Sequence, residues 1–336
     1  MRVTPPLTGH LDMAISNFIK GYRQPEQSML QDFLFPRLPV IRSNDRYWVY
    51  GKENLQLTEK TGRAFGTSPQ EARFTVSNDS YSCKSNALKA TIADEDRDNY
   101  TIGDLNRDTA QLLQDKNLLS REVRVKNIVT NSAIYPAGNT LALGAAAQWD
   151  NFATSDPVMD VKRAARQVKR TGQKPNLFTC SGDVFDALSV NPNLRKDVRF
   201  AQVTGPLNEQ QVATALGIEK VVVGDAIYND GSDENSFLWS NFAMLLYCPQ
   251  GVSAPAGVLS GTGAEGSIGP KDLSFGKSFT WTTAPSTVDG YGVMVSRHPD
   301  ATAKSDVVGV DWYTDEKVTG ADCGFLFTTP LATPSN

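Results

Sequence analysis

Apolar positions near the middle of the chain recur at helical spacing and predict one long helix over residues 94–134. The positions that hold an approximate period of 3.6 residues are Ile102, Leu105, Leu112, Leu113, Leu119, Val123, Ile128 and Val129. Four acids stand at its start: Asp94, Glu95, Asp96 and Asp98. We expect them to offset the positive end of the helix dipole, with a calcium site as the alternative.

A second helix is marked at both ends. Asp156 suits the cap, Pro157 the first turn and Gly172 the stop. Its apolar face holds Val158, Val161, Ala165 and Val168, and the neighbouring face holds Lys162, Arg166, Lys169 and Arg170. We expect the basic face to be solvated, with nucleic-acid contact as the alternative.

Alternating apolar and polar residues predict strands on both sides of these helices. Residues 47–93 are typical of two strands joined by a long tip, which is a projecting hairpin. A buried strand at 176–182 precedes helices at 183–194 and 207–218. Residues 220–228 and 236–248 predict a hairpin, and residues 306–319 and 324–329 predict two more strands.

The segment before the hairpin is apolar but broken by prolines. Phe33, Leu34 and Phe35 form a cluster, and Pro36 and Pro39 follow it. Proline lacks the backbone donor and biases the preceding residue toward extended conformations. An extended arm has no internal partner for its apolar side chains, so it must lie on the main body or on another copy of the protein.

Composition places the chain among globular proteins. It has 336 residues, 40% of them hydrophobic, with a formal net charge of −4 and a pI near 5.4. This charge argues against a dedicated nucleic-acid binder. The sequence has neither an apolar run of about 18 residues nor a signal-peptide core at its start. We therefore expect a soluble protein, without a membrane partner, that is made in a cytoplasm.

The sequence contains few residues in patterns typical of catalysis or of metal or cofactor binding. We therefore predict no cofactor, no metal and no enzyme. The four cysteines are 97, 68 and 75 residues apart, which fits neither a zinc site nor a compact disulfide framework. There are only two histidines. The glycine pattern at 261–266 lacks the strand and helix that a dinucleotide site needs. Ser181 stands at a strand–helix turn, where we expect it or Asp183 to cap the helix.

Four phrases, in order, resemble the major capsid proteins of tailed bacteriophages, the fold named after phage Hong Kong 97. They are FLFPRLPVIRSNDRYWVYGKENL, the helix–strand–helix from Asp156 to Phe200, LGIEKVVVGDAIYN, and SDVVGVDWYTDEKVTGADCGFLF. The resemblance implies an α+β fold with an N-terminal arm, an extended β-hairpin loop, a long spine helix, and peripheral and axial domains. The implied boundaries are an arm at 1–45, the loop at 46–95, a peripheral domain at 96–175, an axial domain at 176–305, and C-terminal strands at 306–336 that return to the peripheral domain.

The same resemblance implies a structural protein that self-assembles into hexamers and pentamers of an icosahedral shell. The shell would enclose double-stranded DNA without binding it specifically, and it would be assembled in the cytoplasm of a bacterial host. Scaffolding, portal and decoration proteins are candidate partners. Arm and loop would contact neighbouring subunits through Phe33, Leu34, Phe35, Leu38, Val40, Tyr47, Trp48, Tyr50, Lys52, Lys60 and Phe65.

Two alternatives stay open from sequence. One is a non-viral compartment shell of the same fold, and the other is a β-rich hydrolase that uses Ser181 or a pair of acids. The capsid interpretation predicts megadalton particles. It also predicts that deleting residues 1–45 abolishes the particles and leaves a folded body, whereas the hydrolase predicts a small oligomer that loses activity on Ser181→Ala.

Overall fold

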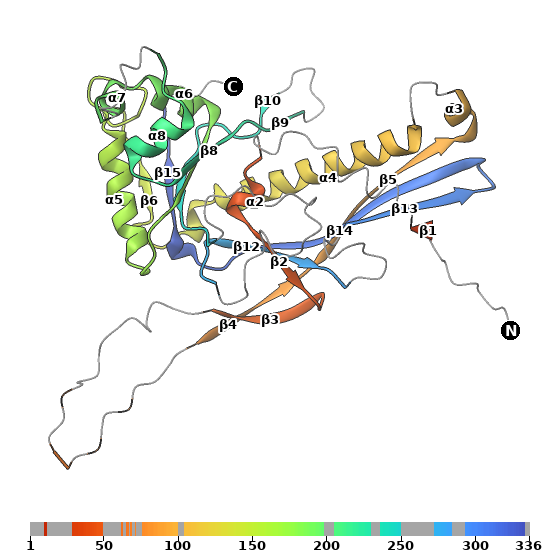
Figure 1. Cartoon of the computed structure of the whole chain (residues 1–336), viewed down its shortest axis with the longest axis horizontal. Coiled ribbons are helices and arrows are strands. Elements are labelled where there is room, and N and C mark those ends of the chain that lie inside the picture. Colours follow the sequence, from red (N-terminus) through yellow and green to blue (C-terminus); the bar gives the residue numbers. More distant parts are fainter. Residues whose placement is uncertain are drawn as a thin grey trace.

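Two β-sheets and one long helix organise the computed structural model (Figure 1). The structure describes residues 10–11, 29–49, 62, 65–66, 68, 71, 76–99, 104–197, 205–229, 236–249, 272–283 and 293–332. Among these residues, none of the helices combines the length and the apolar character that crossing a bilayer requires.

The first sheet has six strands and is built around β14 (Ser305–Val318). On one side of β14 lie β13 (Val293–Asp300) and β12 (Gly276–Trp281), and on the other lies β5 (Lys84–Ala93). Two strands from the start of the chain extend this sheet, β1 (His10–Leu11) beside β13 and β2 (Arg37–Val40) beside β12. Residues 10–11 and 37–40 are therefore part of the body.

The long helix packs against this sheet but is shorter than the sequence predicts. Residues 94–134 hold two α-helices, α3 (Asp94–Asn99) and α4 (Leu105–Val129), and a 3₁₀ turn at Ser132–Ile134. The break has a local cause, because Asp104 has an extended backbone and its side chain accepts the Asn106 N–H at 3.1 Å, as an N-cap does. The acidic run therefore opens α3 instead of the spine helix α4.

The buried face of α4 also differs from the predicted one. Leu112 is 53% exposed, and Ile102 lies outside the described residues. Polar side chains occupy much of the buried face instead: Asn106, Gln114, Asn117, Arg121 and Glu122. About half of the buried positions of α4 are polar, so the spacing of apolar residues did not predict which face is buried.

The second sheet has five strands in the order β6-β15-β11-β7-β8. Their bounds are Thr140–Ala142, Gly324–Thr328, Ala243–Leu246, Leu177–Ser181 and Lys220–Gly224. Four helices accompany it: α5 (Pro157–Lys169), α6 (Gly182–Val190), α7 (Pro192–Asp197) and α8 (Glu209–Leu216). The core between these layers includes Trp149, whose ring centroid lies 5.1 Å from that of Phe327.

Local rules predicted α5 well. The Asp156 side chain accepts the Met159 N–H at 3.1 Å, Pro157 is the first helical residue, and Gly172 has φ +84°. The predicted helix at 183–194 is two helices, because Asn191 leaves the helical conformation between α6 and α7.

The predicted hairpin of residues 220–248 is wrong. Strand β7 lies between β8 and β11, pairing parallel with the first and antiparallel with the second. Of the residues that the structure describes here, two on each side form a hairpin, β9 (Ile227–Tyr228) with β10 (Ser236–Phe237). Strand β11 is entirely buried, so its apolar side chains fit the middle of a sheet better than a solvated hairpin.

The two last strands lie in different sheets. Strand β14 belongs to the six-stranded sheet and β15 to the five-stranded one. Strands β12 and β13, from within the range 176–305, also lie beside β14, whereas β6 and α5, from the range 96–175, pack with β15. The sheets therefore divide the chain differently from the boundaries that the resemblance implies, and we propose the sheets as the better division.

The extended hairpin is described at its base. Strand β3 (Asn44–Val49) pairs antiparallel with β4 (Ser77–Ser82) in a separate two-stranded sheet. The predicted tip falls largely outside the described residues.

Candidate assembly site: the arm anchor and the loop base

The apolar cluster of the arm is buried in its own chain. Residues Gln31–Leu34 form a short helix, α2, and Leu30, Leu34 and Phe35 are fully buried. The Phe35 ring meets Phe275 edge to face at 6.0 Å. The prediction that Phe33, Leu34, Phe35 and Leu38 fill grooves of neighbouring subunits is therefore corrected, because the body of the same subunit already covers them.

Strand β2 continues this attachment. It pairs parallel with β12, and Leu38 lies against Phe279 with only 5% of its surface exposed. Val40 is half-buried next to the same cluster. Fully burying an apolar side chain contributes about 1.5–3 kcal/mol, so this arm segment stabilises the body substantially.

A buried charge network fixes the arm to α4. The guanidinium of Arg121, which is fully buried, contacts Asp32 of the arm at 2.6 Å and Glu316 of β14 at 3.3 Å. It also donates to the Phe35 carbonyl at 3.1 Å. One side chain thus joins the arm, the spine helix and the six-stranded sheet.

Two further arginines complete the network. Arg37 pairs with Asp32 at 3.1 Å, and Arg124 pairs with Glu316 at 3.3 Å. Arg37 and Arg121 also lie over the Trp312 ring, at 5.0 and 5.3 Å from its centroid. Burial opposes ionisation of Asp32, but the charges of Arg37 and Arg121 outweigh it and hold the pKa of that carboxyl well below its usual range.

The neighbouring Glu122 holds the same segment by its backbone. Its carboxylate accepts the N–H groups of Leu30 and Gln31 at 2.7 and 2.9 Å, and the indole N–H of Trp239 at 2.7 Å. Burial raises the pKa of Glu122 to about 7, although the three hydrogen bonds oppose the shift. Sequence reasoning missed Arg121 and Glu122, since adjacent charges in a helix usually indicate a solvated face.

The replacement Glu122→Gln is expected to remove a pH dependence of stability. The pKa of this carboxyl is about 7 in the folded chain against 4.5 for the free group, so the folded state favours the protonated form. The contribution of this carboxyl to the free energy of unfolding is complete below pH 4.5, and it is lost as the pH rises through the folded-state pKa of about 7. Denaturant titrations should therefore show that the free energy of unfolding of the wild type, relative to the variant, falls between about pH 5 and about pH 8.

The exposed residue Glu95 of α3 provides a matched control for this prediction. Glu95→Gln removes the same charge from the surface and is measured over the same range. A Glu122→Gln difference that does not fall with pH relative to this control would contradict the assigned role of the buried carboxyl.

Aromatic rings attach the loop base to the body. Tyr81 of β4 stacks on Phe279 of β12 with centroids 4.4 Å apart, and Tyr47 lies 5.0 Å from the same ring. The Tyr47 hydroxyl donates to Asp79 across the strand pair at 2.9 Å. Tyr47, which the sequence analysis assigns to the contacts between subunits, therefore supports the loop base within its own subunit.

The outer side of the loop base is apolar and uncovered. Trp48 of β3 is 62% exposed, and Ile41 of the turn before it is 79% exposed. Phe65, in the loop beyond these strands, is fully exposed. Exposed large apolar side chains close together, such as Ile41 and Trp48, are typical of a binding surface. The other predicted contacts Tyr50, Lys52 and Lys60 lie outside the described residues.

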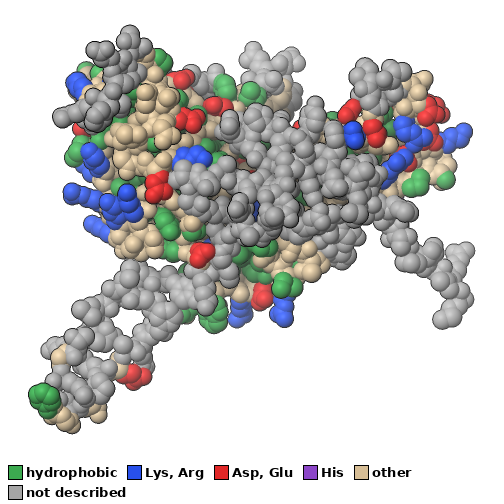
Figure 2. Space-filling view, viewed as in Figure 1, with side chains coloured by type: hydrophobic (Ala, Val, Ile, Leu, Met, Phe, Trp, Pro, Cys, Tyr) green, Lys and Arg blue, Asp and Glu red, His purple; other side chains and the backbone are tan. Residues whose placement is uncertain are grey.

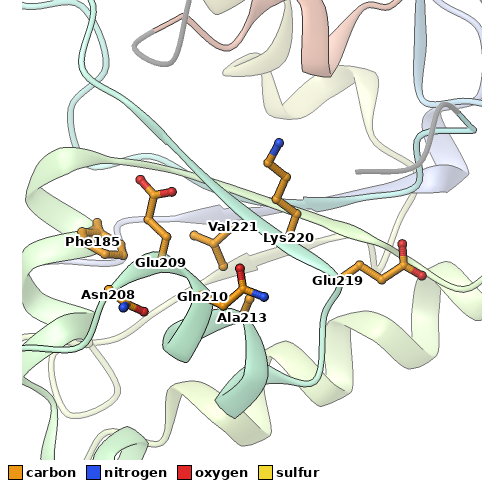
Figure 3. Close-up of a pocket in the computed structure, with 8 residues that line it drawn as sticks. All are labelled: Phe185, Asn208, Glu209, Gln210, Ala213, Glu219, Lys220 and Val221. Atoms are coloured by element: carbon orange, nitrogen blue, oxygen red, sulfur yellow. The ribbon is translucent and has the colours of Figure 1, made fainter. Parts of the chain in front are cut away.

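A hollow of about 490 Å³ lies beside α8 and β8 (Figure 3). Glu209, Glu219 and Lys220 supply its charges, and Asn208 closes the start of α8 with a capping box. The Lys220 ammonium lies 4.9 Å from the centroid of Phe33, so the hollow borders the anchored arm. Its lining residues include neither a nucleophilic thiol or hydroxyl nor a histidine.

Ser181 is built into the fold instead of facing a substrate. It is fully buried at the end of β7, where its hydroxyl accepts the Phe242 N–H at 3.0 Å and bonds with Asp183. This geometry contradicts the hydrolase alternative in the form that uses Ser181. The described residues also hold no cluster of metal-binding side chains, and Arg97 engages the acids of α3 by pairing with Asp94 at 3.0 Å.

Comparison with known proteins agrees with a shell subunit. No family model matches the chain. The major capsid protein of Burkholderia phage BcepMu is 24% identical over 245 residues, which cover 71% of this chain and 76% of that protein. A phage-related protein of Bordetella bronchiseptica RB50 has a TM-score of 0.72 and 24% identity, covering 97% of this chain and 99% of that one.

The capsid of the cyanophage P-SCSP1u extends the likeness to an assembled shell. Its TM-score is 0.57 at 10% identity, over 91% of this chain and 89% of that one. At this identity the likeness concerns the fold. The chain therefore has the Hong Kong 97-like fold and is similar in sequence to a phage major capsid protein, which identifies it as a structural subunit of a virion shell.

Proposed function

We propose that the chain assembles head to tail into hexamers and pentamers, with its loop base lying on the neighbouring subunit of the ring. The exposed apolar surface of β3 and the preceding turn carries this proposal, because Trp48 of β3 and Ile41 of the turn are exposed beside a sheet of only two strands. Tyr47 and Tyr81 attach one face of this strand pair to Phe279, and Trp48 lies on the other face. Cover from a second copy would stabilise that second face.

The anchored arm fixes the position of the loop relative to the body of its subunit. Because residues 29–40 are fixed to α4 and β12 within one subunit, the hairpin that follows leaves the body at a defined place and in a defined direction. A subunit that presents its loop in one orientation offers the neighbour a single way to bind. Heterologous contacts of this kind close into rings when the rotation allows.

Contact with the packaged double-stranded DNA is proposed to be weak and non-specific. The chain carries a formal net charge of −4, so a shell of many copies repels a polyanion at long range. Scaffolding, portal and decoration proteins remain candidate partners of the assembled shell.

The purified wild-type chain is expected to form megadalton particles, which velocity sedimentation and electron microscopy can detect. Replacing Trp48 with aspartate should lower the yield of particles at least about tenfold, since it puts a charge where apolar surface must be buried. The melting temperature should change little, because Trp48 is exposed in the single subunit.

Asn78 gives a matched control, because it lies directly opposite Trp48 in the strand pair. Asn78→Asp adds the same charge to the same two strands without removing apolar surface. Equal particle yields from the two variants would contradict a role for the Trp48 side chain in assembly.

A further inference from the structure

The small hairpin beside the five-stranded sheet exposes two large apolar side chains. Ile227 of β9 and Phe237 of β10 are directly opposite each other in the ladder, with 54% and 47% of their surfaces exposed. Directly opposed residues point to the same face of a strand pair and lie in contact distance. The hairpin therefore offers one compact apolar pair to solvent.

A second apolar patch lies on α5, α6 and the segment before α5. Phe152, Met159 and Val190 are between 42% and 45% exposed. Hydrogen bonds hold their segments together, since the Asn191 amide donates to the Trp149 carbonyl at 3.2 Å and to the Ser155 hydroxyl at 3.1 Å. Three exposed apolar side chains on adjoining segments exceed what scattered surface residues would give.

The two apolar surfaces lie on different sides of the same end of the molecule. Figure 1 shows β9 and β10 on one side of α6, and α5 and α7 on the other. Two distinct patches on different sides are what a head-to-tail contact needs, because each copy uses one patch toward the next copy and the other toward the previous copy.

The charges around the two surfaces have opposite sign. Asp183, Asp186 and Asp225 gather where β8 leads into the hairpin, and burial together with this crowding raises the pKa of Asp225. Beside the patch, the cations Lys162, Arg163 and Arg166 follow Met159 on the exposed face of α5, and α7 adds Arg195 and Lys196. These five cations outnumber the acids of the same face, Asp156 and Asp160, of which Asp160 pairs with Arg163 at 3.5 Å. Figure 2 shows the basic side chains gathered along that edge. Complementary charges favour this pairing over contact between like surfaces.

We infer that the Ile227–Phe237 pair of one copy docks on the Phe152–Met159–Val190 patch of the next copy in the capsid ring. The occupant is a second copy of this chain, oriented so that the acids near the hairpin face the basic side of α5. This contact rests on the proposed ring assembly and adds a second seam to it, distinct from the loop base. The docked hairpin covers apolar side chains that no described residue of the same chain covers.

Site-directed crosslinking tests the contact in assembled particles. Chains with Met159→Cys and differently tagged chains with Ile227→Cys are co-assembled and treated with a short bis-maleimide. A crosslinked product that carries both tags is expected at a level at least about tenfold above that from Leu112→Cys with Ile227→Cys, because Leu112 is more exposed than Met159 but lies on α4. Native thiols contribute little, since three are buried and burial raises the pKa of Cys83 to about 12.

The outcomes separate the two proposals. If the wild-type chain forms no particles, ring assembly itself fails. If particles form and the Met159–Ile227 product does not exceed the Leu112 product, this seam is overturned while the assembly stands. A double variant, Ile227→Asp with Phe237→Asp, gives an independent check: at least a tenfold loss of particles with an unchanged melting temperature supports the seam, and a wild-type yield overturns it.

Discussion

Replacing Arg121 with methionine is expected to lower the free energy of unfolding by about 3–5 kcal/mol. The guanidinium is fully buried between the carboxylates of Asp32 and Glu316, and methionine would replace only its aliphatic stem. The two carboxylates would stay covered with one cation fewer, and the Phe35 carbonyl would lose its donor. Urea denaturation of the two proteins, followed by far-ultraviolet circular dichroism, measures the difference.

Arg124 supplies the matched control. It contacts the same Glu316 but is one-third exposed, so Arg124→Met should cost less than about 1 kcal/mol. In a chain that already carries Asp32→Asn and Glu316→Gln, the effect of Arg121→Met should shrink, because no buried charge is left without its partner. A loss at Arg121 no larger than that at Arg124 would show that the network does not anchor the arm.

A chain that lacks residues 1–45 is expected to lose its cooperative fold as well as its particles. The deletion removes Leu30, Leu34 and Phe35 from the core, separates β2 from β12, and leaves Arg121 without Asp32. A large-to-small change at one such position costs about 2–5 kcal/mol, and the whole stability of a domain is typically about 5–15 kcal/mol. Loss of the near-ultraviolet dichroism and of the sigmoidal urea transition would be the measured result.

A shorter deletion, of residues 1–28, separates the two parts of the arm. It keeps the anchored segment, so a cooperative transition should persist. This expectation replaces the one made from sequence, where removal of residues 1–45 leaves a folded body. A truncated 46–336 chain that unfolds at the wild-type urea concentration would refute the anchoring role assigned to the arm.

The sequence predicted those parts of the fold that depend on interactions between residues close together in the chain. The cap at Asp156 and the stop at Gly172 mark α5 because capping depends on a few adjacent residues. The strands β7, β14 and β15 follow from short apolar or alternating runs. The capsid fold itself came from the resemblance of four phrases.

Long-range pairing could not be predicted in the same way. Residues 220–228 and 236–248 look like a hairpin because they are close in sequence, yet β7 enters between β8 and β11. The sequence does not say which of several buried strands is the better neighbour. The same limit applies to β15, which lies far along the chain from its partner β6.

The sequence predicted only part of the candidate assembly site, for a related reason. Trp48 and Phe65 are exposed, as an assembly surface requires, but Phe33 and Phe35 are not. An apolar residue in the sequence indicates burial, but it does not indicate whether its own chain or a neighbouring subunit buries it. Arg121 is the clearest omission, since its burial depends on Asp32 and Glu316, which are distant in sequence.

The place of β15 also bears on when a newly made polypeptide becomes competent to join a shell. This strand separates β6 from β11 and buries Phe325 and Phe327, so the five-stranded sheet has a gap until residues 324–328 leave the ribosome. Nascent molecules on one messenger would then be unable to present the finished surfaces of α5 and the β9–β10 hairpin to each other. Polymerisation would then wait for this strand, which protects a crowded polysome from premature lattice growth.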